Sequence, residues 1–203
     1  MSFKLGITGL IGMGKTTVAS LFQKYNVPVW NADENVHRIY QKGASGYEAL
    51  TNKFPKLSND FGINRDQLTQ MILKNEISFD ILEAIVHPLL SREREKFILT
   101  NDHRPLIVFE IPLLFETKAD LWLDAVLLVT CSKTNQISRL KKRTGFTKRK
   151  LDLLMSKQQK NTTQKEKATF VVNTDKTLTE IEKEVKKVML AIEDGSNGKR
   201  SSS

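Results

Sequence analysis

The fold is decided by one short stretch near the N-terminus, Gly9-Leu10-Ile11-Gly12-Met13-Gly14-Lys15-Thr16. It matches the pattern G-x-x-x-x-G-K-[ST] at every fixed position, after an apolar run and before a helical pattern. A glycine-rich loop lets successive backbone N–H groups turn inward around phosphate oxygens. The following helix adds the positive end of its dipole. Lys15 can reach the β- and γ-phosphates and Thr16 can hold Mg²⁺, so the stretch predicts a P-loop that binds a nucleoside triphosphate.

Outward from this loop, short apolar runs alternate with helical patterns. Five runs predict strands, at residues 3–8, 27–30, 106–109, 125–129 and 170–172. Apolar spacing predicts helices at 16–25, 35–40, 65–73, 79–86, 89–97 and 179–192. Strands that alternate with helices favour a parallel sheet with right-handed crossovers. The predicted fold class is therefore α/β, with a five-stranded parallel sheet flanked by helices.

The stretch between the second and third strands divides the chain. It is too long for a simple crossover, so we expect a helical acceptor-binding subdomain at 33–96, at the sheet edge where ligands bind. The nucleotide-binding core is then expected at 1–32, 97–138 and 168–193. We interpret 139–167 as a basic helical lid and the polar residues 194–203 as a disordered tail.

The composition is that of a globular protein. The chain has 203 residues, 39% of them hydrophobic and 27% charged, which excludes a collagen, a disordered chain and a membrane bundle. The single cysteine, Cys131, excludes an internal disulfide framework and cysteine-based zinc sites. The first residues lack a basic region before a long apolar one, and no apolar run reaches about 18 residues. We therefore expect a cytoplasmic protein without a membrane partner.

The net charge of +9 is concentrated in the last third of the chain. Residues 131–203 hold 18 Lys and Arg against 8 Asp and Glu, and residues 139–150 hold seven basic residues and no acid. Three interpretations compete: a solvated helical face, a nucleic-acid patch and a clamp for a phosphate-rich substrate. Phe146 is the one aromatic residue within 139–150, so the segment offers no stacking platform for single strands.

A small kinase is the class of P-loop protein that fits the rest of the chain. A GTPase should carry N-K-x-D, but the Asn-Lys at 52–53 is followed by Phe54 and Pro55. Asp33 stands just past the second strand, where a carboxylate can accept a proton from an acceptor hydroxyl or orient it for attack. Asp is also a favoured N-cap for a following helix, and position alone does not separate the two roles.

Four stretches together resemble the dephospho-CoA kinase family: residues 6–17, 29–33 (VWNAD), 87–89 (HPL) and 110–116 (EIPLLFE). The similarity runs in order from about residue 3 to about residue 190. It implies a P-loop kinase-like fold and the transfer of the ATP γ-phosphate to the ribose 3′-hydroxyl of dephospho-CoA. It also implies ATP and dephospho-CoA as partners and Mg²⁺ as cofactor.

On the phosphate side, the resemblance implies a loop that wraps the ATP phosphates with Gly12, Met13, Gly14, Lys15, Thr16 and Thr17. Lys15 is implied on the transferring phosphoryl group and Thr16 on Mg²⁺. Glu110, at the end of the third strand, is implied to bind the metal through water. These positions make up the predicted ATP and metal site.

The basic lid acquires a role from the same resemblance, which implies arginines that neutralise the phosphoryl oxygens. Arg139, in the segment Gln136-Ile137-Ser138-Arg139, and Arg143 are one helical turn apart, so both can face one anion. The resemblance also implies that Asn173, after the fifth strand, lies where the backbone contacts the adenine ring of ATP in this family.

On the acceptor side, the resemblance implies Asp33 as the base or orienting group. It implies Arg65 and His87 in the acceptor cleft and Leu114 in an apolar wall. Two of these have a structural alternative: His87 as a helix-terminal residue before proline, and Leu114 as core. The catalytic set is then Asp33, Lys15 and Arg139.

The chain departs from the family pattern at several positions: Leu10, Met13, Thr16, Asn31 and Glu110. Leu10 and Met13 lie at loop positions that contribute their backbone and not their side chains, and Thr16 keeps the hydroxyl of the usual serine. Asn31 replaces a commoner aspartate, so it either lowers the affinity for the metal or serves only to orient Asp33. The reaction type is expected to survive these changes.

Two other classes stay open at this point. One is another P-loop small-molecule kinase, such as a nucleoside monophosphate or shikimate kinase. The other is a basic nucleic-acid-binding or regulatory protein, against which the sparse aromatics and localised charge speak. We expect small-molecule substrates, no nucleic-acid partner, and a monomer or weak homo-oligomer.

Overall fold

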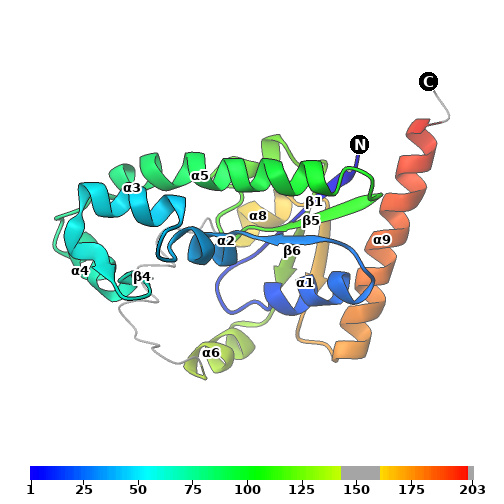
Figure 1. Cartoon of the computed structure of the whole chain (residues 1–203). Coiled ribbons are helices and arrows are strands. Elements are labelled where there is room, and N and C mark those ends of the chain that lie inside the picture. Colours follow the sequence, from blue (N-terminus) through cyan, green and yellow to red (C-terminus); the bar gives the residue numbers. More distant parts are fainter. Residues whose placement is uncertain (143–160, 201–203) are drawn as a thin grey trace. The chain divides into compact units, whose positions relative to one another are not determined.

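The computed structural model describes residues 1–142 and 161–200 (Figure 1). The chain forms two compact units, Met1–Trp30 with Asn101–Ser203, and Asn31–Thr100. Arg143, predicted in the lid, lies outside the described residues. Within the described ranges, no helix is both long enough and apolar enough to cross a membrane.

The first unit is built on a five-stranded sheet in the order β2-β5-β1-β6-β7. Its strands are β1 Phe3–Thr8, β2 Val29–Asn31, β5 Leu106–Glu110, β6 Ala125–Thr130 and β7 Phe170–Asn173. β1 pairs in parallel with β5 and β6, and β6 with β7. Every residue of β5 and all but the last of β6 are buried, as strands covered on both faces should be. The prediction of a five-stranded parallel α/β fold is confirmed.

Four described helices belong to this unit: α1 Lys15–Lys24, α6 Lys133–Lys141, α8 Asn161–Lys167 and α9 Leu178–Arg200. α1 and α9 contact each other and share one apolar core with the strands, in which Phe22 and Val185 have no exposed surface. α8 contacts β6. α9 continues through 194–200, where the sequence predicts a disordered tail, because adding a residue to an existing helix needs no new nucleation.

The second unit is mainly helical, with α2 Ala32–Ile39, α3 Ser45–Lys53, α4 Arg65–Leu73 and α5 Phe79–Thr100. α2 and α3 pack on α5, around an apolar core that includes Leu50, Leu57 and Ile77. Four elements were not predicted: α3, whose sequence SGYEALTNK has few apolar residues, the 3₁₀ helix Pro55–Leu57, and the antiparallel strands β3 Ser58–Asn59 and β4 Gly62–Ile63. The helix at 65–73 is confirmed.

The prediction of two helices at 79–86 and 89–97 is wrong, because α5 is a single helix with Pro88 inside it. Proline in a helix interior removes one hydrogen bond and costs about 3 kcal/mol. Apolar residues on both sides of it, including Val86, Leu89 and Leu90, pack into the core of the unit. This packing offsets the proline penalty, and it also means that His87 is not at a helix terminus.

Candidate functional site

The predicted P-loop has the backbone shape that its glycines allow. Gly9 has φ 148°, and a Cβ there would lie 2.3 Å from the carbonyl oxygen of Val129. Gly14 has φ 93° and is the N-cap of α1. No side chain caps this helix, and its first turn holds no acidic residue. The helix therefore begins with backbone donors and a positive dipole end suited to an anion.

Two side chains at the start of α1 have defined partners. The Lys15 ammonium donates to the carbonyl oxygen of Gly9 at 2.8 Å and to that of Leu10 at 3.4 Å. The Thr16 hydroxyl donates to Oε1 of Glu110 at 2.9 Å. Glu110 is only 4% exposed at the end of β5, so the pair sits where the sequence predicts a metal site.

A hydroxyl beside a carboxylate fits a hard divalent cation that uses few protein ligands and completes its shell with phosphates and water. Among the described residues, no group of three or more His, Cys, Asp or Glu side chains could hold a metal by itself. The Thr16–Glu110 pair is therefore chemically suited to a hard divalent cation and not to a zinc-type site.

Met13, one of the departures from the family pattern, turns its side chain into the unit. It is 3% exposed, and its sulfur accepts from the backbone N–H of Cys131 at 3.1 Å. The Cys131 thiol lies 3.3 Å from the same sulfur, and burial raises its pKa. The Met13 side chain is therefore part of the buried core of the unit.

Arg139 projects from α6 and contacts the loop from outside. Its Nη1 donates to the Thr174 hydroxyl at 2.7 Å and to the Met13 carbonyl at 3.3 Å, and its Nη2 donates to the Thr174 carbonyl at 2.6 Å. Asn173, predicted near adenine, ends β7, and its side-chain oxygen accepts from the backbone N–H of Asp175 at 2.8 Å. The predicted ATP-side residues that the structure describes therefore gather in one unit.

The sequence indicates no role for three residues of this unit: Gln136 and Thr174, which contact the P-loop, and Asp175, which contacts the start of α6. Gln136 Nε2 donates to the Ile11 carbonyl at 2.7 Å. The Asp175 carboxylate accepts hydrogen bonds from the backbone N–H and hydroxyl of Ser132 and from the side-chain amide of Asn135, at the start of α6. These bonds lower the pKa of Asp175, and the bond from Asn135 has the largest effect. The sequence offers a signal only for Thr174 and Asp175, since polar residues directly after a parallel strand lie at its ligand-binding edge.

In the second unit, Asn31 caps α2, which settles one of the alternatives for Asp33. The Asn31 side chain accepts from the Glu34 N–H at 3.0 Å, and its carbonyl accepts from the Asn35 side chain at 2.8 Å. Asp33 is therefore not the N-cap. Its carboxylate is exposed and has no hydrogen-bond or ion-pair partner among the described residues.

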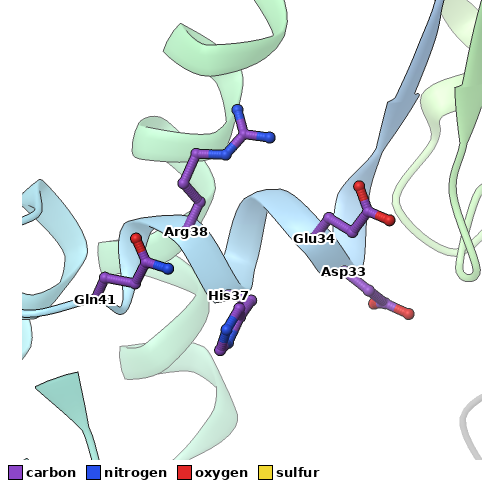
Figure 2. A pocket seen from close by; sticks show the side chains of 5 residues that line it. All are labelled: Asp33, Glu34, His37, Arg38 and Gln41. Carbon is purple, nitrogen blue, oxygen red and sulfur yellow. The ribbon is translucent and has the colours of Figure 1, made fainter. Parts of the chain in front are cut away.

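Asp33 also lines a pocket along α2 of about 410 Å³ (Figure 2). The other lining residues are Glu34, His37, Arg38 and Gln41. Figure 2 shows Asp33 and His37, one turn apart, on the same side of the helix, with Arg38 on the other. An exposed carboxylate on a capped first turn keeps its acceptor capacity for a ligand.

The remaining acceptor-side predictions fall at separate places. Arg65 is the exposed first residue of α4, and its charge acts on buried Tyr40, whose pKa burial raises to about 12. His87 is exposed in the interior of α5. Leu114, in the first unit, has no exposed surface, which favours the alternative of a core residue over that of an acceptor wall.

This sheet, with a phosphate loop after its central strand, defines the class as a P-loop kinase-like protein. Within that class, a protein-family model described as dephospho-CoA kinase matches residues 3–180. The match covers most of the chain, including the whole helical unit, so the chain belongs to the dephospho-CoA kinase family.

Individual relatives agree with this assignment. A dephospho-CoA kinase from Jannaschia sp. (strain CCS1) is 40% identical over 175 residues, which are 86% of this chain and 90% of the relative. One from Rhodopseudomonas palustris (strain BisB18) is 36% identical over 189 residues, 92% of this chain and 94% of the relative. The crystal structure of TT1252 from Thermus thermophilus has a TM-score of 0.81 at 28% identity, covering 94% of this chain and 97% of that one.

Proposed function

We propose that this protein transfers the γ-phosphoryl group of ATP to the ribose 3′-hydroxyl of dephospho-CoA, giving coenzyme A and ADP. The observation that carries the proposal is the family match over residues 3–180, because it extends beyond the P-loop through the whole helical unit. A P-loop alone is common to many kinases. The relatives that are named dephospho-CoA kinase align over most of their own length.

Lys15 and the first turn of α1 bind the phosphates in this proposal. The Lys15 ammonium exchanges the carbonyls of Gly9 and Leu10 for oxygens of the β- and γ-phosphates. Its contacts in the structure support this, because a cation that is held by two neutral carbonyl acceptors gains from a charged acceptor. Arg139 neutralises phosphoryl charge from the α6 side.

We propose Mg²⁺ as the cation. The Thr16 hydroxyl and the buried carboxylate of Glu110 would hold it, directly or through water. When bound, the ion neutralises charge on the phosphate oxygens and orients them for in-line transfer. Because the two protein oxygens are 2.9 Å apart, they can share one hydrated ion.

Asp33 accepts or orients the proton of the acceptor hydroxyl. Its exposed carboxylate on a capped helical turn supports this role, because it has no partner of its own among the residues the structure describes. Arg65 and His87 are proposed to contact the acceptor from α4 and α5. We expect the enzyme in the cytoplasm, as a monomer or weak homo-oligomer.

The test is ADP release from Mg-ATP with dephospho-CoA, compared with AMP, shikimate and no acceptor. We expect strong turnover with dephospho-CoA alone and coenzyme A as the product by mass spectrometry. The Lys15→Ala variant, folded by circular dichroism, should show none. Turnover with AMP or shikimate instead would contradict the acceptor assignment while leaving the P-loop assignment intact.

A further inference from the structure

Thr174 is a buried polar residue whose hydroxyl bonds the P-loop and α6, with the Thr130 carbonyl on β6 as a longer contact at 3.3 Å. It directly follows β7 and is 3% exposed. Its hydroxyl donates to the carbonyl oxygen of Met13 at 2.7 Å and accepts from Nη1 of Arg139 at 2.7 Å. The first of these contacts joins residues 161 positions apart in the chain. A buried hydroxyl that is used both as donor and as acceptor fixes the groups it joins.

The bond to Met13 sets the direction of a neighbouring donor. A peptide unit is planar, and in a trans unit the carbonyl and the following N–H point in opposite directions. Within the part of the chain that the structure describes, no peptide bond is cis. Holding the Met13 carbonyl toward Thr174 therefore turns the Gly14 N–H away from it. In a P-loop, the N–H groups that face the loop interior are those that bind phosphate.

A second P-loop carbonyl, two residues before Met13, is held in the same way. Gln136 Nε2 donates to the Ile11 carbonyl at 2.7 Å, which turns the Gly12 N–H in the opposite direction. Thr174 and Gln136 thus each hold a P-loop carbonyl from outside. Close packing adds to this at Gly14, where a Cβ would lie 3.2 Å from the Thr174 hydroxyl and 3.3 Å from Nη1 of Arg139.

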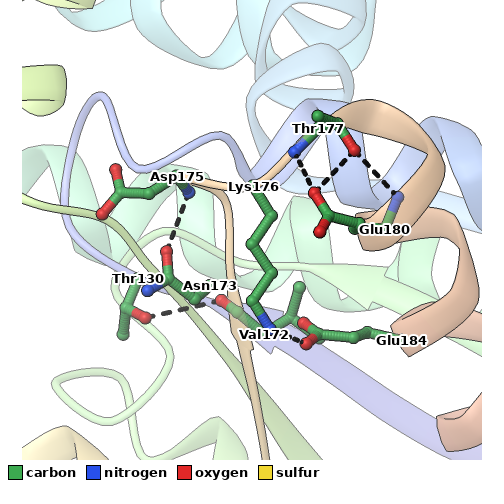
Figure 3. A network of polar contacts seen from close by, with 8 residues as sticks. All are labelled: Thr130, Val172, Asn173, Asp175, Lys176, Thr177, Glu180 and Glu184. Atoms are coloured by element: carbon green, nitrogen blue, oxygen red, sulfur yellow. Dashed lines mark hydrogen bonds and ion pairs between the residues drawn. The ribbon is translucent and has the colours of Figure 1, made fainter.

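The residues that flank Thr174 in the chain, Asn173 and Asp175, are held by hydrogen bonds, as are Thr177 and Glu180 (Figure 3). The Asn173 side chain accepts from the Asp175 N–H, and Thr177 and Glu180 form a capping box at the start of α9. The Asp175 carboxylate binds the Ser132 N–H at 2.7 Å. Thr174 is therefore attached to a rigid turn and can impose its geometry on the loop.

We propose that Thr174 is a positioning residue, which aims the Gly14 amide at the nucleotide phosphates and holds the guanidinium of Arg139 beside the loop. This inference deepens the proposed function and rests on it for the reaction, although its effect on nucleotide binding does not depend on the acceptor. The ligand that responds is a nucleoside di- or triphosphate, because Gly14 directly precedes Lys15, which reaches the β- and γ-phosphates that a monophosphate lacks.

The test compares nucleotide affinities of Thr174→Val, which keeps the shape and removes the hydroxyl, with those of Thr174→Ser, which keeps the hydroxyl. Thr130→Val is the matched control, because Thr130 is the neighbouring residue on β6 and, among the described residues, its hydroxyl bonds only the Val172 carbonyl, at 3.5 Å. Calorimetry gives Kd for Mg-ADP and Mg-ATP without acceptor, and competition against ADP gives Kd for AMP. Urea unfolding reports the stability of each variant.

We expect Thr174→Val to weaken Mg-ADP and Mg-ATP binding about tenfold, the effect of one lost hydrogen bond, and AMP binding less than twofold. Thr174→Ser should restore wild-type affinity, and Thr130→Val should leave it unchanged. In turnover, KM for ATP should rise more than kcat falls. If the valine variant does not fold, Thr174→Ala is measured in its place.

Unchanged ATP affinity in the valine variant would overturn the proposal. An equal loss of affinity for AMP and ATP would also overturn it, as would a Thr174→Ser variant that binds ATP as weakly as Thr174→Val. A merely structural role of Thr174 predicts these two results. Failure of the wild-type enzyme to phosphorylate dephospho-CoA would overturn the proposed function instead, and the nucleotide affinities would still decide the role of Thr174.

Discussion

From the sequence, Asp33 could be either the N-cap of the following helix or the group that accepts a proton. In the structure, Asn31 is the N-cap, and Asp33 is left available for the second role. Asn31 caps α2, and the carboxylate of Asp33, two residues on, is exposed. An amide at position 31 caps the helix as well as an aspartate does, since both side chains are favoured N-caps. The departure from the commoner aspartate is therefore compatible with a positioned Asp33.

Asp33→Asn should lower kcat by about 10²- to 10⁴-fold, the usual contribution of a proton-accepting side chain. The Kd of Mg-ATP should change less than about twofold, because the role proposed for this carboxylate is toward the acceptor. Steady-state kinetics and calorimetry measure the two quantities. The matched control is Glu34→Gln, the neighbouring exposed carboxylate of the same pocket, which should keep its kcat; equal losses in both variants would argue for a general charge effect.

Asn31→Ala should lower the free energy of unfolding by about 1 kcal/mol, the usual effect of losing an N-cap. It should also lower kcat, because the first turn that holds Asp33 loses its anchor. Asn31→Asp keeps an acceptor for the Glu34 N–H and should match the wild type in urea unfolding. A lower half-saturating Mg²⁺ concentration in Asn31→Asp would instead assign position 31 to the metal.

Among the helices, α2 is followed directly by a buried tyrosine, whose ionisation makes the stability of the unit depend on pH. Tyr40 follows α2, and burial in the apolar core of its unit raises its pKa to about 12, opposed by the charge of Arg65. The backbone carbonyl of Tyr40 also accepts from the Ile63 N–H at 2.9 Å. The residue thus joins α2 to the segment before α4 while its hydroxyl stays protonated.

Tyr40→Phe should flatten the pH dependence of stability in alkali. The pKa in the folded state is raised to about 12, above the value of about 10 in the unfolded chain. The folded state therefore binds more protons in this interval, and its stability falls as pH rises from about 10 toward 12. Urea unfolding followed by far-UV circular dichroism at pH 9 to 11.5 measures the slope.

The control for this prediction is Tyr47→Phe, because the Tyr47 hydroxyl lies near the surface of the same unit, 2.8 Å from that of Ser58. It should leave the alkaline slope as steep as in the wild type. A slope that is the same in wild type, Tyr40→Phe and Tyr47→Phe would show that Tyr40 is not the group responsible.

At the scale of the whole molecule, the two units have separate apolar cores. The phosphate loop, the Thr16–Glu110 pair and Arg139 belong to one, and Asp33, Arg65 and His87 to the other. If the helical unit binds the acceptor, the two substrates should stabilise different parts of the chain, because each ligand slows the local opening that would release it.

Hydrogen exchange should show this division. Mg-ADP at about 100 times its Kd should slow exchange up to about 100-fold in the P-loop and in α6. Dephospho-CoA should add protection in α2, α4 and α5. The Lys15→Ala variant should lose the first effect and keep the second. Protection by dephospho-CoA confined to the sheet unit would contradict an acceptor-binding role for residues 31–100.

The sequence by itself determined the class of this protein. Strands, P-loop and family motifs are encoded in neighbouring residues, through apolar runs and glycine spacing, so five strands and the helix at 65–73 were predicted from it. Elements whose formation depends on packing were not: α3 has a weak apolar face, and α5 passes through Pro88 because its flanks are buried.

Only the tertiary structure decided which side chains hold the site. It made Asn31 the cap, buried Leu114, and brought Thr174 to the Met13 carbonyl across 161 positions of sequence. The physical reason is that a hydrogen bond between distant residues depends on where the sheet places the ends of its strands. Hydrophobic periodicity and helix or strand propensity do not predict such long-range contacts. The conformation of a loop of consecutive residues, in contrast, is determined by those residues themselves.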